Sequence, residues 1–171
     1  YYRVKAMKVL VVDDDRVLRE MFSSLLEEEG HTVGCAPNGI DALNLLRKGK
    51  YDITFLDLKM PKMNGLELLG RIKEEKIDTI PIMITGYATI ESAVEAMKSG
   101  AYDYVQKPFD MKKIKETMKN ALSERSFKNG VSVAFDKVDP FALVKDLSKN
   151  MPVLGLTTVK DVRCKENPNV N

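Results

Sequence analysis

Residues 8–15 read Lys-Val-Leu-Val-Val-Asp-Asp-Asp, and the predicted sheet and the predicted site both start from this stretch. The apolar residues 9–12 predict a short strand that is buried in a parallel sheet. The carboxyl end of such a strand faces the ligand crevice, and the aspartates follow there. Neighbouring carboxylates raise each other's pKa, and Mg²⁺, which takes oxygen ligands, removes that conflict. An Asp is also a good helix N-cap, so we expect Asp15 to cap the next helix and Asp13 and Asp14 to bind the metal.

The composition is that of a soluble globular protein. Its 171 residues, 44% hydrophobic and 30% charged, suffice for one domain with an extension. A net charge of +2 argues against a dedicated nucleic-acid surface, so we expect no direct nucleic-acid binding. Cys35 lies in an apolar run and Cys164 in a polar tail, which predicts no disulfide framework and a reducing, cytoplasmic location. We expect no membrane span and no signal peptide.

Five predicted strands alternate with five predicted helices along the first part of the chain. The strands are predicted at residues 9–12, 32–36, 51–56, 80–84 and 102–105. The helices are predicted at residues 16–29, 41–48, 66–72, 90–97 and 111–122. Parallel strands need crossover helices, and this spacing supplies them. The alternation therefore predicts a doubly wound α/β domain with a parallel sheet.

Four of the five predicted strands end in residues that suit phosphoryl transfer. Asp13 and Asp14 follow the first strand, Asp57 the third, Thr85 ends the fourth, and Lys107 follows the fifth. Any one of these residues alone would be an ordinary cap or surface residue. As a group, they suit one reaction: Asp57 would be the carboxylate nucleophile for phosphorus, and Asp13 and Asp14 would hold Mg²⁺. Thr85 and Lys107 would contact the remaining phosphoryl oxygens. Positioning and charge neutralisation are the main needs of this reaction.

The motifs at these strand ends resemble the receiver domain of two-component response regulators, the CheY-like domain. They are Val-Val-Asp-Asp at 11–14, Asp-Leu-Lys-Met-Pro at 57–61, Asn-Gly at 64–65, Thr-Gly at 85–86 and Tyr-Val-Gln-Lys-Pro-Phe at 104–109. The match runs from about residue 7 to residue 125, and residues 85–104 are similar to receivers of the NtrC type. The resemblance implies a flavodoxin-like, five-stranded parallel sheet in the order 2-1-3-4-5.

The resemblance also implies a role for each site residue. Asp57 would accept a phosphoryl group from a phosphohistidine on a sensor histidine kinase or a phosphotransfer protein. Asp13, Asp14, Asp57 and the backbone carbonyl of Lys59 would ligate Mg²⁺. Lys107 would contact the phosphate, and the bond from Lys107 to the following proline would be cis.

A conformational switch follows from the same resemblance. Phosphorylation adds roughly −1.5 to −2 charge and strong acceptor oxygens. Thr85 would move toward them, and Tyr104 would rotate into the space that Thr85 leaves. The affected face would comprise residues 90–97, 102–105 and 111–122, where a homodimer or an output would form. We expect a phosphoacceptor signalling domain, with at most slow autodephosphorylation, and not an enzyme.

The chain after the receiver is predicted to be a separate extension. We assign residues 1–125 to the receiver, 126–130 to a linker and 131–171 to a βαβ-like strand-helix-strand unit. Its strands are predicted at 131–135 and 152–157, with a helix opening at Asp139-Pro140. Such a unit cannot bury both sheet faces alone. It is therefore either the start of a larger output domain or a segment that docks on the receiver or on a second copy.

Two other functions fit parts of the pattern. A haloacid-dehalogenase-type phosphatase also has an Asp-x-Asp after its first strand, and Asp13 would then be the nucleophile. That family places a further acidic pair after the lysine, whereas only Asp110 follows Lys107 closely. The second alternative is a degenerate receiver that acts only as a binding module. We interpret His31, the only histidine, as structural.

Overall fold

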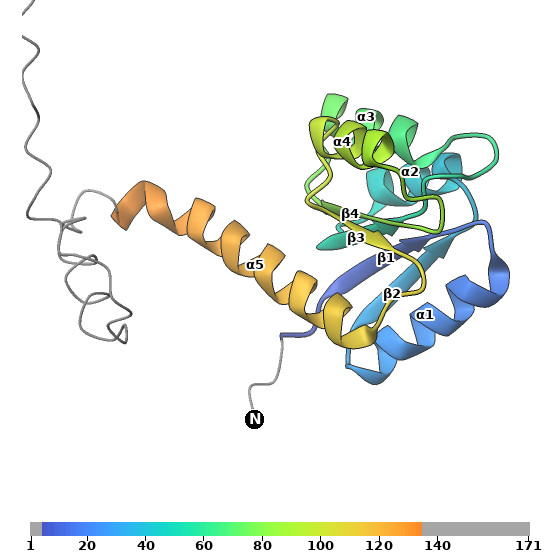
Figure 1. Cartoon of the computed structure of the whole chain (residues 1–171). Helices are drawn as coiled ribbons and strands as arrows, with labels where there is room; N and C mark the ends of the chain where they lie inside the picture. The colour runs from blue at the N-terminus through green and yellow to red at the C-terminus, as the bar shows by residue number, and fades with distance from the viewer. Residues whose placement is uncertain (1–4, 135–171) are drawn as a thin grey trace, which may run out of the picture. The chain divides into compact units, whose positions relative to one another are not determined.

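The computed structural model describes residues 5–134, which form a parallel sheet between two layers of helices (Figure 1). The strands are β1 (Lys8–Val12), β2 (Thr32–Ala36), β3 (Ile53–Leu56), β4 (Ile80–Thr85) and β5 (Asp103–Gln106). The helices are α1 (Arg16–Glu28), α2 (Gly39–Lys48), α3 (Gly65–Glu74), α4 (Ile90–Lys98) and α5 (Met111–Ala134). The strand order is β2-β1-β3-β4-β5 with parallel pairing throughout, which confirms the predicted fold. No helix within the described residues has both the length and the hydropathy to cross a bilayer.

The core lies on both faces of the sheet, because successive strand residues point to opposite sides. On one face, Leu10 and Val12 of β1 pack with buried residues of α2 and α3. On the other face, Val9 and Val11 pack with buried residues of α1 and α5. Figure 1 shows the same arrangement, with α2, α3 and α4 on one side of the sheet and α1 and α5 on the other. The four apolar residues of β1 are therefore buried, as their pattern predicts.

Polar side chains cap the helices that start at the carboxyl edge of the sheet. Asp15 accepts a hydrogen bond from the backbone N–H of Leu18 at 3.1 Å, which confirms its predicted role as the N-cap of α1. Asn38, Asn64 and Thr89 cap α2, α3 and α4 in the same way. These bonds satisfy backbone donors that have no partner within the helix, and they fix where each loop ends.

Gly65 allows the start of α3 to lie against the end of β3. A Cβ atom at this position would stand 2.2 Å from the backbone oxygen of Asp57. The N–H of Gly65 donates to the carbonyl of Leu58 at 2.9 Å, which closes the loop between β3 and α3. Only a residue without a side chain permits this approach, so the Asn-Gly pair positions the backbone around Asp57.

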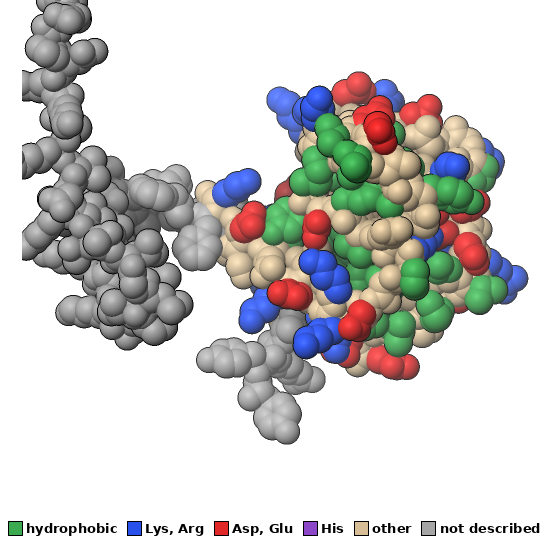
Figure 2. Space-filling view, in the orientation of Figure 1, with side chains coloured by type: hydrophobic (Ala, Val, Ile, Leu, Met, Phe, Trp, Pro, Cys, Tyr) green, Lys and Arg blue, Asp and Glu red, His purple; other side chains and the backbone are tan. Residues whose placement is uncertain are grey.

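The larger apolar side chains of α4 do not face the sheet. Ile90, Val94 and Met97 are 82%, 47% and 49% exposed, and Ala96 is the buried residue of this helix. Hydrophobic side chains are visible on the surface over α4 in the upper part of Figure 2. The helix therefore packs on the sheet through a small residue and leaves its larger apolar residues at the surface.

The linker predicted at residues 126–130 is helical in the structure, and the strand predicted at 131–135 is wrong for its described residues, 131–134. Helix α5 continues through these residues to Ala134. A single glycine, here Gly130, costs about 1 kcal/mol relative to alanine in a helix interior, and the helix continues past it. The predicted helix from Asp139 and the predicted strand at 152–157 lie outside the described residues.

Candidate functional site

The site lies at the carboxyl edge of the sheet, where backbone hydrogen bonds hold two aspartates next to each other. The N–H of Asp57 donates to the carbonyl of Val12 at 2.9 Å, so the end of β3 is paired with the end of β1. The N–H of Asp13 donates to the carbonyl of Ala36 at 3.2 Å, which ties the end of β1 to β2. Both carboxylates are buried. The main chain therefore determines that these two acidic groups share one crevice.

Lys107 joins the two carboxylates. Its Nζ donates to Oδ2 of Asp13 at 2.5 Å and to Oδ2 of Asp57 at 3.3 Å. The second oxygen of each carboxylate accepts from a backbone N–H, that of Asp15 at 2.9 Å and that of Leu58 at 2.7 Å. The bond between Lys107 and Pro108 is cis, as predicted. Residues from three strand ends therefore form one hydrogen-bonded unit.

Burial and charge act in opposite directions on the pKa values in this unit. Burial raises the pKa of Asp13, and the hydrogen bond from Lys107 offsets only part of that increase. Burial alone would lower the pKa of Lys107, but its hydrogen bond to Asp13 and the negative charge of Asp57 outweigh burial, so its pKa is raised. Lys107 therefore stays protonated at neutral pH. Burial, in contrast, disfavours the charged form of Asp13, and additional positive charge nearby would stabilise it.

Asp14 completes an acidic cluster with Asp13 and Asp57. Each carboxylate contributes an oxygen within 4.8 Å of the others, and Asp14 is exposed to the crevice. The three carboxylates and the Lys107 ammonium group carry a combined charge of −2 when all are ionised. A hard divalent cation neutralises that charge, and oxygen atoms are the ligands that Mg²⁺ takes. The residues present therefore fit the magnesium site that the sequence predicts.

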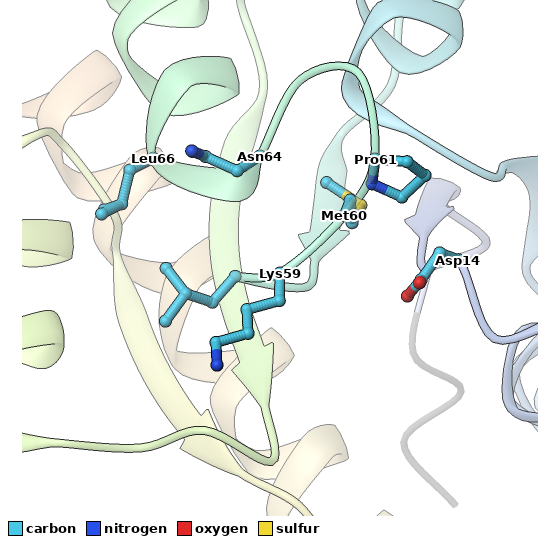
Figure 3. Close-up of a pocket in the computed structure, with 7 residues that line it drawn as sticks. Asp14, Lys59, Met60, Pro61, Asn64 and Leu66 are labelled. Atoms are coloured by element: carbon cyan, nitrogen blue, oxygen red, sulfur yellow. The ribbon is translucent and has the colours of Figure 1, made fainter.

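An open cleft adjoins the acidic cluster on the side of the loop after β3. Its volume is about 530 Å³, and its lining includes Asp14, Lys59 and Asn64. Figure 3 shows Asp14 and Lys59 lining this cleft from the loops that follow β1 and β3. The Lys59 Nζ lies 3.8 Å from the centre of the Tyr87 ring, a cation–π contact between the loops after β3 and β4. A ligand bound at the cluster would therefore be open to solvent through this cleft.

Thr85 and Tyr104 lie on the neighbouring strands β4 and β5. Thr85 is fully buried, and its Oγ1 accepts a hydrogen bond from the N–H of Tyr87 at 3.1 Å. The carbonyl of Thr85 accepts from the N–H of Lys107 at 2.9 Å, which brings the ends of β4 and β5 together. Tyr104 is half-buried, and its hydroxyl lies 2.8 Å from Oγ of Ser92.

Sequence reasoning missed two contacts of the site. Arg19 of α1 donates to the carbonyl of Asp13 at 2.6 Å, and Ser92 of α4 contacts Tyr104. The spacing of Thr89 and Ser92 is a signal for a helix start, but it gives no indication of a partner on β5. His31 has a structural contact, as interpreted, because its Nδ1 accepts from a backbone N–H at 3.3 Å.

The sequence profile of the response regulator receiver domain matches residues 9–119. The chain belongs to the response regulator receiver family. Receiver domains are signalling domains of two-component systems, and the predicted resemblance is confirmed. The predicted CheY-like fold is confirmed as well.

Relatives of the NtrC type are similar to this receiver. The chain is 36% identical over 124 residues to the regulatory protein AtoC of Escherichia coli (strain K12), which covers 72% of this chain and 27% of AtoC. It is 33% identical over 123 residues to the DNA-binding transcriptional regulator NtrC of Azospirillum brasilense, which covers 72% of this chain and 26% of that protein. The receiver thus spans about a quarter of the length of these curated relatives.

Solved receiver structures are similar over nearly their whole length. The response regulator TrrA of Thermotoga maritima, determined in complex with Mg²⁺ and BeF, is 36% identical with a TM-score of 0.62. The match covers 67% of this chain and 98% of that one. The receiver domain of Francisella response regulator 1452 is 30% identical with a TM-score of 0.66, and the match covers 70% of this chain and 98% of that one.

Proposed function

We propose that this receiver accepts a phosphoryl group on Asp57 from the phosphohistidine of a sensor histidine kinase or a phosphotransfer protein. The observation that carries the proposal is the contact of one ammonium group with two buried carboxylates, Lys107 with Asp13 and Asp57, at the carboxyl edge of the sheet. Transfer of a phosphoryl group depends mainly on positioning and on neutralising its charge. This unit provides a fixed acceptor oxygen and a fixed cation next to it.

The chemistry of the step assigns a task to each residue. An oxygen of the Asp57 carboxylate forms a bond to phosphorus while the bond from phosphorus to the histidine nitrogen breaks. The imidazole leaves with the electron pair of that bond and takes up a proton. Asp57 is the better acceptor than Asp14, because its hydrogen bonds from Lys107 and from the N–H of Leu58 hold it in one orientation.

Mg²⁺ is the cofactor that the acidic cluster would hold, with Asp13, Asp14, Asp57 and the backbone carbonyl of Lys59 as ligands. When bound, it would neutralise charge on the phosphoryl oxygens. The chain's own contribution is to hold the carboxylates close together. Lys107 does this through its hydrogen bonds to Asp13 and Asp57, and its bond to Asp13 opposes the rise in pKa that burial causes there.

Thr85 and Tyr104 would transmit the phosphorylated state to the surface. The Thr85 hydroxyl is buried and bonded to a backbone N–H, so a phosphoryl group on Asp57 would offer it a stronger, charged acceptor. Movement of Thr85 would free space for the Tyr104 ring. The resulting shift would affect the surface formed by α4, β5 and α5.

A second copy of the chain is the proposed occupant of this surface. Three large apolar side chains of α4 are exposed there, and residues 93, 94, 97 and 98 line a hollow of about 460 Å³. Met97→Lys would place a charge in this apolar surface. We expect sedimentation of the phosphorylated protein to give a dimer for the wild type and a monomer for this variant.

Intact mass after incubation with acetyl phosphate tests the acceptor. The wild type should gain the mass of one phosphoryl group with Mg²⁺ and much less without it, and Asp57→Asn should gain none. Asp52→Asn is the matched control, because Asp52 lies before the same strand and accepts from the N–H of Lys8 at the opposite end of the sheet. Equal phosphorylation of Asp57→Asn and the wild type would contradict the proposal.

A further inference from the structure

Ser92 of α4 contacts the side chain of Tyr104 from the neighbouring strand β5. Its Oγ lies 2.8 Å from the Tyr104 hydroxyl, across 12 residues of sequence. The Tyr104 ring packs against the core on the α2–α4 side of the sheet, so its hydroxyl reaches the first turn of α4. A phenol in this position is held at two ends, by apolar contacts along the ring and by one hydrogen bond at its tip.

The Ser92 hydroxyl is itself fixed by the cap of α4. The N–H of Thr89 donates to Oγ of Ser92 at 3.1 Å, and the N–H of Ser92 donates to Oγ1 of Thr89 at 3.0 Å. Oγ of Ser92 also donates to the carbonyl of Thr89 at 3.1 Å. Oγ1 of Thr89 also donates to Oγ of Ser92 at 3.0 Å, and either the Ser92 or the Tyr104 hydroxyl can be the donor in the bond between them. The Ser92 hydroxyl is therefore oriented before Tyr104 binds to it, which reduces the entropy that the bond costs.

The same cap is connected to Thr85 by a short piece of chain. The N–H of Tyr87 donates to Oγ1 of Thr85, and Thr89 follows two residues later. A displacement of Thr85 breaks or moves that bond and shifts the segment that carries Thr89. Because Thr89 holds Ser92, the displacement would reach the hydrogen-bond partner of the Tyr104 hydroxyl.

We propose that Ser92 is a positioning residue that holds Tyr104 in the unphosphorylated orientation and couples its release to the N-terminus of α4. The proposal rests on the proposed phosphoacceptor function and names the residue through which its switch is held. A neutral hydrogen bond changes a two-state equilibrium by about 2- to 12-fold. Loss of the bond should increase the population of the switched conformation by that factor in the unphosphorylated protein.

A double-mutant cycle on the full chain tests the coupling. The variants are Ser92→Ala, Tyr104→Phe and the double variant, with amide chemical shifts of α4 measured without ligand and with saturating beryllofluoride and Mg²⁺. Each single variant should move the ligand-free shifts toward the saturated position, and the double variant should move them no further, because both substitutions remove the same bond. Ser92→Thr keeps the hydroxyl and should restore the wild-type shifts.

Ser123→Ala is the matched control, since the Ser123 hydroxyl bonds only to the helix carbonyl of Lys119 among its described contacts. If Ser92→Ala moves the shifts and Tyr104→Phe does not, Ser92 acts through the helix cap alone and the proposal is overturned. Additive effects of the two substitutions overturn it as well. Failure of acetyl phosphate to modify the wild type is a separate result, which contradicts the phosphoacceptor function. The shifts of the variants measured without ligand would then still test the bond between Ser92 and Tyr104.

Discussion

Replacement of Lys107 by methionine removes the ammonium group between two carboxylates and keeps a side chain of similar length. The side chain of Lys107 is 16% exposed, and those of Asp13 and Asp57 are 5% and 7% exposed. Removing one partner of a buried ion pair costs about 3–5 kcal/mol, because an uncompensated charge stays behind. Water reaches part of Lys107, so we expect Lys107→Met to lose about 2–4 kcal/mol of unfolding free energy at pH 7 without Mg²⁺.

Urea denaturation followed by circular dichroism measures this loss. Lys113→Met is the matched control, because Lys113 is exposed on α5 and its replacement should change stability by no more than about 0.5 kcal/mol. Added Mg²⁺ should recover more stability in Lys107→Met than in the wild type, since the cation would supply the missing positive charge.

The pH dependence of the Lys107 variant has a defined sign. Burial already raises the pKa of Asp13 in the folded state, and loss of Lys107 removes a hydrogen bond that lowers it. Asp13 then binds a proton more tightly in the folded state than in the unfolded state, where its carboxyl group has the ordinary pKa of 3.8. The stability deficit should therefore shrink as the pH falls from neutral toward that value. A variant as stable as the wild type at pH 7, with no gain on acidification, would refute the electrostatic account.

Four further substitutions test the fold. Gly65→Ala should lower the free energy of unfolding by about 1–3 kcal/mol in urea denaturation, because its Cβ would stand 2.2 Å from the Asp57 carbonyl oxygen. Gly70→Ala in the same helix is the control, since a Cβ there meets open space and should raise the free energy of unfolding by about 0.5–1 kcal/mol. Burial lowers the pKa of His31, so the melting temperature should fall as the pH drops below 6.5. His31→Gln should show a smaller fall over this pH range, and a pH profile identical to that of the wild type would contradict the prediction. Phe22→Ala should lose about 3–5 kcal/mol in urea, and a loss below 1 kcal/mol would contradict the core packing described.

The location of the site could be predicted because its residues follow buried strands. In a parallel sheet the carboxyl ends of strands meet at one edge, so Asp13, Asp57 and Lys107 were expected to converge, and the structure joins them by hydrogen bonds. The strand order depends on which crossovers the chain takes, which local patterns do not record. It came from the family resemblance, and it is confirmed.

The parts that sequence did not predict depend on contacts between distant residues. Residues 90–97 were expected on the switch face, where Ile90 and Met97 are exposed, but no local pattern showed that α4 packs on the sheet through Ala96. The contact of Ser92 with Tyr104 requires α4 and β5 to be adjacent, which neither segment indicates alone. The low helix propensity of Gly130 indicates a break, but α5 continues past it.

The central claim is that a single carboxylate carries the phosphoryl group, and locating the acyl phosphate tests it most directly. Borohydride reduces an aspartyl phosphate to homoserine, which peptide mass spectrometry places in the sequence. After treatment with acetyl phosphate and Mg²⁺, we predict homoserine at residue 57 and unmodified aspartate at residues 13 and 14. Homoserine at residue 13, the nucleophile of the phosphatase alternative, or at no residue of the cluster, would contradict the account.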